Sequence, residues 1–205
     1  MGQKKKEIME SKFYFFGPLL YHAKLDEKIL DQIRNLCSKD KQKDNRAYLA
    51  GHLDHEYKID PIKLEHILSP VFENFYGVHK TFYNRYAEGQ YVVGAWVNYM
   101  KKGDFNPLHE HSNCDWSGVI YLQIPDELRQ EQNSWIGTDT GPGGILFRQK
   151  IDTIPSFINS VSFYPVVGDT FIFPSQLKHS VYPFKSDGER ITVAFNTKDR
   201  LKTNG

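Results

Sequence analysis

Three histidines in the C-terminal half of the chain have the type and spacing of metal ligands. His109 and His111 lie two positions apart, just before the apolar run 116–122. In an extended segment the side chains at i and i+2 share one face, so both imidazoles can point into one cavity. His179 follows a second apolar run, 169–174, and can bring a third nitrogen to the same point. Because neutral imidazole binds iron, zinc, copper and nickel, this pattern predicts a metal enzyme.

An arginine follows the histidines in another strand-like run. Arg190, Thr192 and Ala194 alternate with apolar residues over 190–196, so they share the less apolar face, which can line a barrel interior. Taken alone, Arg190 could equally form a surface ion pair, since Glu189 is its neighbour. The three histidines followed by this arginine favour a functional role for the whole group.

The segments that must position these residues indicate a β-rich fold behind N-terminal helices. Asp26 is an expected helix N-cap, and a second helix is expected to begin at Asp60 and to kink or restart at Pro70. The run 13–20 is typical of an edge strand. Six further strands are expected over 92–100, 116–123, 144–148, 160–164, 169–173 and 190–196.

Helices followed by many short strands predict a mainly β protein, in which a helical layer packs on an antiparallel double sheet. We expect a jelly roll or cupin-like barrel. The 205 residues fit a single domain. Within it, 1–90 would support a catalytic core at 91–197, and 198–205 would form a flexible tail. Two polar segments, 45–56 and 125–143, are candidate loops at the barrel mouth; the second is either a lid or an unstructured loop.

Composition excludes several classes of protein. The 26 Lys and Arg nearly balance the 25 Asp and Glu, which argues against a nucleic-acid partner. No stretch approaches the ~20 apolar residues of a membrane span. Cys37 and Cys114 are too few for a disulfide framework, so we expect a cytoplasmic protein. Cys114 lies near the histidine pair, but we interpret it as an ordinary thiol.

The order of the motifs along the chain resembles that of a known protein family. The block comprises Asn98-Tyr99, Gly103, His109-Glu-His111, Ser117-Gly-Val-Ile-Tyr-Leu122, Gly168-Asp-Thr-Phe-Ile-Phe-Pro-Ser175, His179 and Glu189-Arg-Ile-Thr-Val-Ala-Phe-Asn196. It resembles the iron(II)/2-oxoglutarate-dependent dioxygenases, and most of all the small prolyl-hydroxylase-like group of bacteria and marine phages. The resemblance covers roughly residues 90 to 197.

The resemblance implies a double-stranded β-helix and an oxidoreductase that uses Fe(II), 2-oxoglutarate and O2. Such enzymes convert 2-oxoglutarate to succinate and CO2 while they hydroxylate an unactivated C–H bond, here of a peptidyl side chain or a small molecule. Ascorbate is a candidate accessory reductant. The implied location is the cytoplasm of a bacterial or phage-infected cell. The residues carry no code for the prime substrate or for the oligomeric state.

The same resemblance assigns roles to individual residues. His109 and His179 would ligate iron, and Arg190 would bind the distal carboxylate of 2-oxoglutarate through its planar guanidinium. The residues expected to assist Arg190 are Tyr121, Tyr99 and Thr192.

One position departs from the family pattern. The family usually reads His-x-Asp, whereas this chain has His111 at the third position. We favour a site of three histidines, His109, His111 and His179, with Asp115 as the alternative third ligand. Three histidines and water also form a catalytic zinc site, so the metal is less firmly predicted than the site.

Two other functions compete with the oxygenase. A cupin-type metalloenzyme without 2-oxoglutarate is favoured by Gly103 and Pro174, which stand at cupin-like distances before the histidines, but it does not require Arg190. An inert jelly-roll binding module would not need the three histidines. His52 and His55 could form a second metal site, although a polar loop is the simpler interpretation. The remaining single histidines, His22, His66 and His79, are interpreted as ordinary core or surface residues.

Overall fold

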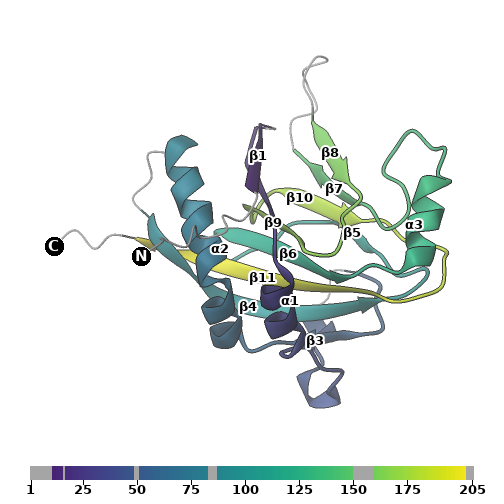
Figure 1. The fold of residues 1–205 in the computed structure, drawn as a ribbon, viewed down its shortest axis with the longest axis horizontal. Coiled ribbons are helices and arrows are strands. Elements are labelled where there is room, and N and C mark those ends of the chain that lie inside the picture. Colours follow the sequence, from purple (N-terminus) through teal and green to yellow (C-terminus); the bar gives the residue numbers. More distant parts are fainter. Residues whose placement is uncertain (1–10, 16, 49–50, 83–86, 150–158, 202–205) are drawn as a thin grey trace, which may run out of the picture.

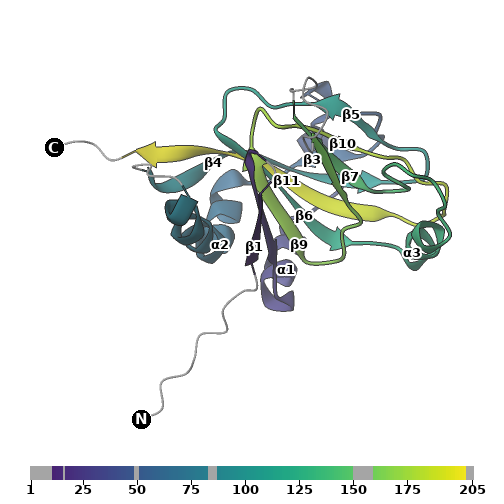
Figure 2. The same ribbon diagram turned by 90° about the horizontal axis from the view of Figure 1, so that it is seen from above.

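Two antiparallel sheets face each other, and two helices cover the outer face of the larger sheet (Figures 1 and 2). We describe this arrangement from a computed structural model, which covers residues 11–15, 17–48, 51–82, 87–149 and 159–201. The lysine-rich stretch 4–6 and the last four residues lie outside these ranges. Among the described helices, none combines the length and the apolar character that crossing a membrane requires.

The larger sheet has seven strands, and all of its pairings are antiparallel. Its order is β1 (Ser11–Phe15), β2 (Leu19–Lys24), β9 (Asp169–Pro174), β6 (Trp116–Gln123), β11 (Arg190–Leu201), β4 (Ala87–Met100) and β3 (Glu56–Lys58). The run 13–20, predicted to be one edge strand, is divided between the edge strand β1 and its neighbour β2, which are separated where Gly17 takes a positive φ of 98°.

The smaller sheet has four strands, in the order β5 (Asn106–His109), β10 (Lys178–Val181), β7 (Ile145–Arg148) and β8 (Ser160–Phe163). Figure 2 shows β5, β7 and β10 on one side of the larger sheet and α1 and α2 on the other. The apolar side chains between the two sheets include Tyr121, Phe147, Phe171 and Phe173. This is the double-stranded β-helix that the sequence predicted.

Two helices form the outer layer. Asp26 caps α1 (Glu27–Arg34), because its carboxylate accepts the backbone N–H of Ile29 at 2.8 Å. Asp60 does the same for α2 (Pro61–Phe82), which continues through Pro70 without ending there. The core between helices and sheet is made by Leu30, Ile33, Leu64, Leu68, Phe72 and Phe75 against Val97, Ile120, Val193 and Phe195.

The structure corrects three sequence predictions. The segment 125–143 is not a structureless loop, because it begins with α3 (Asp126–Asn133). Only Leu128 of this helix is buried, so its sequence shows little helical periodicity. Residues 198–201, which were expected to belong to a flexible tail, are part of β11, which continues to Leu201; the rest of that expected tail lies outside the described residues. Strands β3, β5 and β10 were missed; each has only three or four residues. Two short 3-10 turns, Lys41–Lys43 and Arg46–Tyr48, complete the described elements.

Candidate active site

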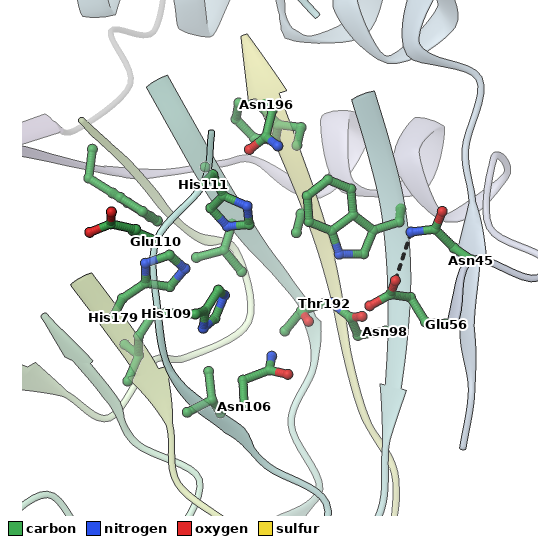
Figure 3. A pocket seen from close by; sticks show the side chains of 18 of the residues that line it. Asn45, Glu56, Asn98, Asn106, His109, Glu110, His111, His179, Thr192 and Asn196 are labelled. Carbon is green, nitrogen blue, oxygen red and sulfur yellow. Dashed lines mark hydrogen bonds between the residues drawn. The ribbon is translucent and has the colours of Figure 1, made fainter. Parts of the chain in front are cut away.

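The smaller sheet brings the three predicted histidines together. His109 on β5 pairs directly with His179 on β10. His111 lies two residues beyond β5, where its backbone N–H donates to the Ser175 carbonyl at 2.9 Å. One ring nitrogen from each of the three lies within 4.8 Å of the others. Figure 3 shows these rings gathered on one side of a pocket.

Backbone carbonyls fix the tautomer of two of the rings. Nδ1 of His109 lies 2.7 Å from the Pro107 carbonyl oxygen, and Nδ1 of His179 lies 3.0 Å from that of Leu177. A carbonyl oxygen only accepts, so each Nδ1 must carry the proton and donate it. The lone pair of each ring is then on Nε2, which is the atom available to a metal.

The pocket also keeps the rings uncharged. Burial, with a smaller contribution from the neighbouring His109, lowers the pKa of His111 to about 4. Burial likewise lowers the pKa of His109, and it holds the pKa of His179 well below its ordinary value. Neutral imidazole is the metal-binding form, so no proton has to leave these rings at neutral pH before a metal binds.

Asp115, the alternative third ligand, points away from this cluster. Its carboxylate accepts the backbone N–H of Asp199 at 2.8 Å, which anchors it to β11. Among the described residues, the group with metal-ligand spacing contains neither Asp115 nor Cys114. Glu110 also stands outside the group, with an exposed side chain at the pocket rim. The prediction that Asp115 could replace His111 is therefore wrong for this geometry.

Arg190 and Tyr121 form a second functional wall of the same pocket, which has a volume of about 410 Å³. Arg190 is 1% exposed and Tyr121 is fully buried. One guanidinium nitrogen donates to the Gly143 carbonyl at 2.8 Å, and another contacts the Met100 sulfur. Neither Arg190 Nε nor the Tyr121 hydroxyl has a hydrogen-bond partner among the described residues.

Among the described residues, this wall gives Arg190 no anionic partner. Burial lowers the pKa of Arg190 and raises that of Tyr121 to about 12, so an unpaired cation lies beside a neutral phenol. Within the described chain, no carboxylate lies within ion-pair distance of Arg190. A buried charge without a counter-ion is costly, and a bound carboxylate would remove that cost. Thr192 lines the pocket opposite Tyr121 in the β11–β6 register.

Tyr99 is not in the pocket, which corrects the role predicted for it. Its neighbours Asn98 and Met100 pair with Thr192 and Arg190, so Tyr99 projects from the opposite face of β4. There its ring packs in the core beneath the helices, 6.0 Å from the Tyr57 centroid. It cannot contact a cosubstrate held by Arg190.

Several polar pocket residues were not predicted individually: Asn45, Glu56, Asn98, Asn106 and Asn196. Glu56 accepts a hydrogen bond from the Asn45 amide at 2.7 Å, and burial raises the pKa of Glu56 to about 7. In the sequence, Asn98 is a polar residue between apolar Val97 and aromatic Tyr99, and this could have marked it as a candidate. Only the pairing register of β4 shows that its side chain faces the pocket. Of the two candidate mouth loops, 45–56 contributes to the pocket lining and 125–143 does not.

The donor set fits the groups that the sequence predicted. Three neutral imidazoles from one side suit a divalent transition metal with open coordination positions. The orphaned Arg190 Nε and Tyr121 hydroxyl suit a carboxylate. The other histidines have ordinary surroundings: His22 lies 3.2 Å from Asp169, and His52 stacks on Phe105. Within the described ranges, His52 and His55 belong to no metal-binding group.

Comparisons with known proteins agree with this geometry. Residues 94–196 match a family described as "Putative 2OG-Fe(II) oxygenase". Among curated protein sequences, none matches the chain significantly.

Solved structures with the same fold include an oxidoreductase of the 2OG-Fe(II) oxygenase family from Burkholderia pseudomallei. It is 17% identical, with 87% of this chain and 82% of that chain covered and a TM-score of 0.52. A Pseudomonas putida prolyl-4-hydroxylase is 16% identical, with coverages of 88% and 92% and a TM-score of 0.53. A viral collagen prolyl hydroxylase from Paramecium Bursaria Chlorella virus-1, solved with 2-oxoglutarate, is 14% identical, with coverages of 88% and 96% and a TM-score of 0.53.

Proposed function

Because the chain belongs to the 2OG-Fe(II) oxygenase family, we propose that His109, His111 and His179 bind Fe(II) and that Arg190 binds the distal carboxylate of 2-oxoglutarate. The protein is an iron- and 2-oxoglutarate-dependent oxygenase, and the reaction proposed for it is a hydroxylation. The observation that carries the assignment of roles is the buried guanidinium of Arg190. It has no anion among the described residues, and it lines the same pocket as three neutral imidazoles.

Each side chain has a defined task. With O2 and 2-oxoglutarate, bound Fe(II) supplies the oxidising chemistry that yields succinate and CO2 and hydroxylates a C–H bond. His109 and His179 present Nε2 lone pairs, because their Nδ1 protons are held by backbone carbonyls. Arg190 donates to the distal carboxylate, and the Tyr121 hydroxyl donates to the same group. Thr192 supplies a further hydroxyl beside them.

The pocket walls favour these charged contacts. Apolar side chains of Ile145, Phe173 and Val181 line the same cavity, and Arg190 is only 1% exposed to solvent. A charge-assisted hydrogen bond is stronger where water is excluded. A cupin-type enzyme without 2-oxoglutarate, or an inert jelly-roll module, would leave Arg190 buried and unpaired at a cost in stability.

The prime substrate is proposed to be a peptidyl side chain or a small molecule. Two of the related structures are prolyl hydroxylases by name, which supports the peptidyl alternative. The near-neutral net charge of +1 disfavours a nucleic-acid substrate. We also propose a cytoplasmic location in a bacterial or phage-infected cell, with ascorbate as accessory reductant; the two free thiols, Cys37 and Cys114, are consistent with a reducing compartment.

Binding of 2-oxoglutarate to anaerobic, metal-loaded protein tests the cosubstrate assignment without knowledge of the prime substrate. Calorimetric titration should show that Arg190→Ala weakens binding about 10–100-fold, since charge-assisted hydrogen bonds contribute roughly 1.5–3 kcal/mol. Arg190→Lys should recover only part of the affinity. Arg200→Ala, an arginine of the same strand paired with Glu65 on the surface, is the matched control and should bind as wild type does.

Two results would contradict the assignment. One is a wild-type protein that does not bind millimolar 2-oxoglutarate. The other is an Arg190→Ala protein that binds as tightly as wild type and keeps its metal. Succinate release from the iron-loaded enzyme in air provides the corresponding measurement of turnover.

A further inference from the structure

The pocket extends beyond the proposed cosubstrate site along one row of the larger sheet. Glu56 pairs with Asn98, Asn98 with Thr192, and Thr192 with Tyr121, so these four residues follow one another across β3, β4, β11 and β6. Adjacent strands lie roughly 5 Å apart, which places Glu56 about 10 Å from Thr192 and about 15 Å from Tyr121. Figure 3 shows Glu56 and Asn45 across the pocket from the histidines. The proposed function assigns the 2-oxoglutarate carboxylate to Arg190, Tyr121 and Thr192, and it assigns no role to Glu56 or Asn98.

Glu56 presents a carboxylate that the protein itself only partly satisfies. Its side chain is 4% exposed and lines the pocket, and the one hydrogen bond to it within the described chain comes from Asn45. No lysine or arginine lies within ion-pair distance of it in the part of the chain described. A carboxylate has room for several donors. The remaining acceptor capacity of Glu56 is therefore available to a ligand in the cavity.

Two neighbours extend this acceptor surface. Asn98 is 4% exposed, and its Oδ1 is buried without a partner among the described residues. Trp96 precedes Asn98 by two positions on the same face of β4 and lines the pocket. Its ring centroid is 5.8 Å from that of His111, so Trp96 connects this wall to the metal ligands. An indole ring also attracts cations through its π face.

The charges of the pocket define what this wall can accept. Arg190 is the single Lys or Arg among the described lining residues, and the proposed function pairs it with 2-oxoglutarate. The histidines are neutral, and the remaining ionisable side chains that line the pocket with a charge are the carboxylates Glu56 and Glu110. A second anionic ligand would be repelled here, whereas a cationic donor would compensate the buried carboxylate.

We propose that Glu56, Asn98 and Trp96 bind a cationic nitrogen group of the prime substrate, an ammonium or a guanidinium. This inference rests on the proposed function and narrows its substrate class to amine- or guanidine-bearing molecules, free or as side chains of a peptide. Glu56 is then a specificity-determining residue. It orients the substrate from the far side of the pocket while the reacting carbon faces the three histidines.

Binding of cationic probes to the zinc- and 2-oxoglutarate-loaded protein tests this proposal. Calorimetry would compare lysine with norleucine and arginine with citrulline, each as the free Nα-acetyl amide, in which only the side chain can carry a cationic nitrogen, and within a short acetylated peptide. At least one cationic probe should bind about tenfold or more tightly than its neutral counterpart. The free and peptide forms distinguish a small-molecule from a peptidyl substrate. Glu56→Gln should abolish most of that preference, because it should weaken the cationic probe about tenfold or more and leave its neutral counterpart nearly unchanged.

Matched variants separate recognition from folding. Glu73→Gln removes one exposed carboxylate from α2, outside the pocket, and should keep the full preference for the cation. Asn98→Leu removes the orphaned acceptor at similar volume and should weaken the cationic probe more than its neutral counterpart. Circular dichroism of each variant reports whether it is folded.

Equal binding of every cationic probe and its neutral counterpart would overturn the proposal, and so would a preference that survives in folded Glu56→Gln. Both outcomes leave the proposed function intact as long as 2-oxoglutarate binds in an Arg190-dependent manner. A failure of 2-oxoglutarate to bind in the first titration would instead count against the proposed function.

Discussion

His111 gives the proposed iron site a charge different from that of the family's usual His-x-Asp arrangement. Three imidazoles donate no negative charge, so the site is one unit more positive than a site of two histidines and a carboxylate. The pKa of His111, lowered to about 4 by burial, keeps the ring neutral and able to ligate. We expect the binding of anionic 2-oxoglutarate beside the ion to gain from this extra positive charge.

Substitution of His111 tests its place in the metal site. His111→Ala should lower metal content strongly, because loss of a direct ligand should exceed the ~10–100-fold cost typical of losing an outer-shell partner. His111→Asp should restore metal binding by supplying the usual carboxylate. Metal analysis of the two purified variants measures both effects. Full metal occupancy in the alanine variant would remove His111 from the ligand set.

Glu56 should make stability depend on pH in a recognisable direction. Its pKa is about 7 in the folded protein, raised chiefly by burial from an ordinary value of 4.5. Folding therefore favours the protonated form of Glu56. The stability that this form contributes is fully present below the ordinary pKa of 4.5 and is lost as the pH rises through about 7. At about 1.4 kcal/mol per pKa unit, the loss between acidic and mildly alkaline pH is about 1–3 kcal/mol.

Urea unfolding of wild type and Glu56→Gln at about pH 5.5 and about pH 8 measures this contribution. The variant keeps an acceptor for Asn45 but cannot ionise, so its stability relative to wild type should rise with pH. Glu73→Gln, which removes one exposed carboxylate from α2, is the matched control. Parallel pH profiles for wild type and Glu56→Gln would contradict the assignment.

At the scale of elements, β6 and β11 fit together because of one glycine. Gly118 lies directly opposite Phe195, and a Cβ added to it would overlap the Phe195 ring. Phe195 is fully buried beneath the helices and cannot move aside freely. Gly118→Ala should therefore destabilise the protein by about 1–3 kcal/mol, as overpacking does.

Gly94 provides the control for that experiment. It lies in β4, and a Cβ added there would meet no atom within 4 Å. Gly94→Ala should leave stability unchanged or raise it by a few tenths of a kcal/mol, because it restricts only the unfolded chain. Denaturant unfolding compares the two variants. Equal effects would show that the close packing of Phe195 on Gly118 is unimportant.

The pattern of short, β-rich apolar runs located β6, β9 and the start of β11 closely, because these strands are mainly apolar. It did not reveal the direction of Tyr99, which depends on the pairing register between β4 and β11. It also missed β5 and β10, whose four residues each are too few for a periodic pattern. The metal-binding histidines were found by their chemistry rather than by their strands.

For the whole molecule, the metal is expected to act as a cross-link within the smaller sheet. His109 and His179 come from distant parts of the sequence that meet only in the folded state. A ligand that binds only the native state stabilises it by about 2.7 kcal/mol when the free ligand concentration is 100 times the dissociation constant. For a chain of this size, the melting temperature should then rise by roughly 5–10 °C.

Thermal unfolding with and without added divalent metal measures this stabilisation. A chelator should reverse it, and the double variant His109→Ala/His179→Ala should show no increase. Arg190→Ala should retain the full metal-dependent increase, because it lies outside the ligand set. An equal increase in the double variant would mean that the metal binds elsewhere.

The hydrogen bonds from His109 and His179 to carbonyls two residues earlier have an evolutionary consequence. Many metal sites orient their imidazoles with a carboxylate side chain, and one mutation can delete it. Here the acceptors belong to the backbone at Pro107 and Leu177, so a side-chain substitution there leaves the acceptor atom in place. The ligand orientation is thus robust to mutation of its surroundings. Descendants of this protein can change the wall around Glu56, and with it the substrate, without having to rebuild the metal centre.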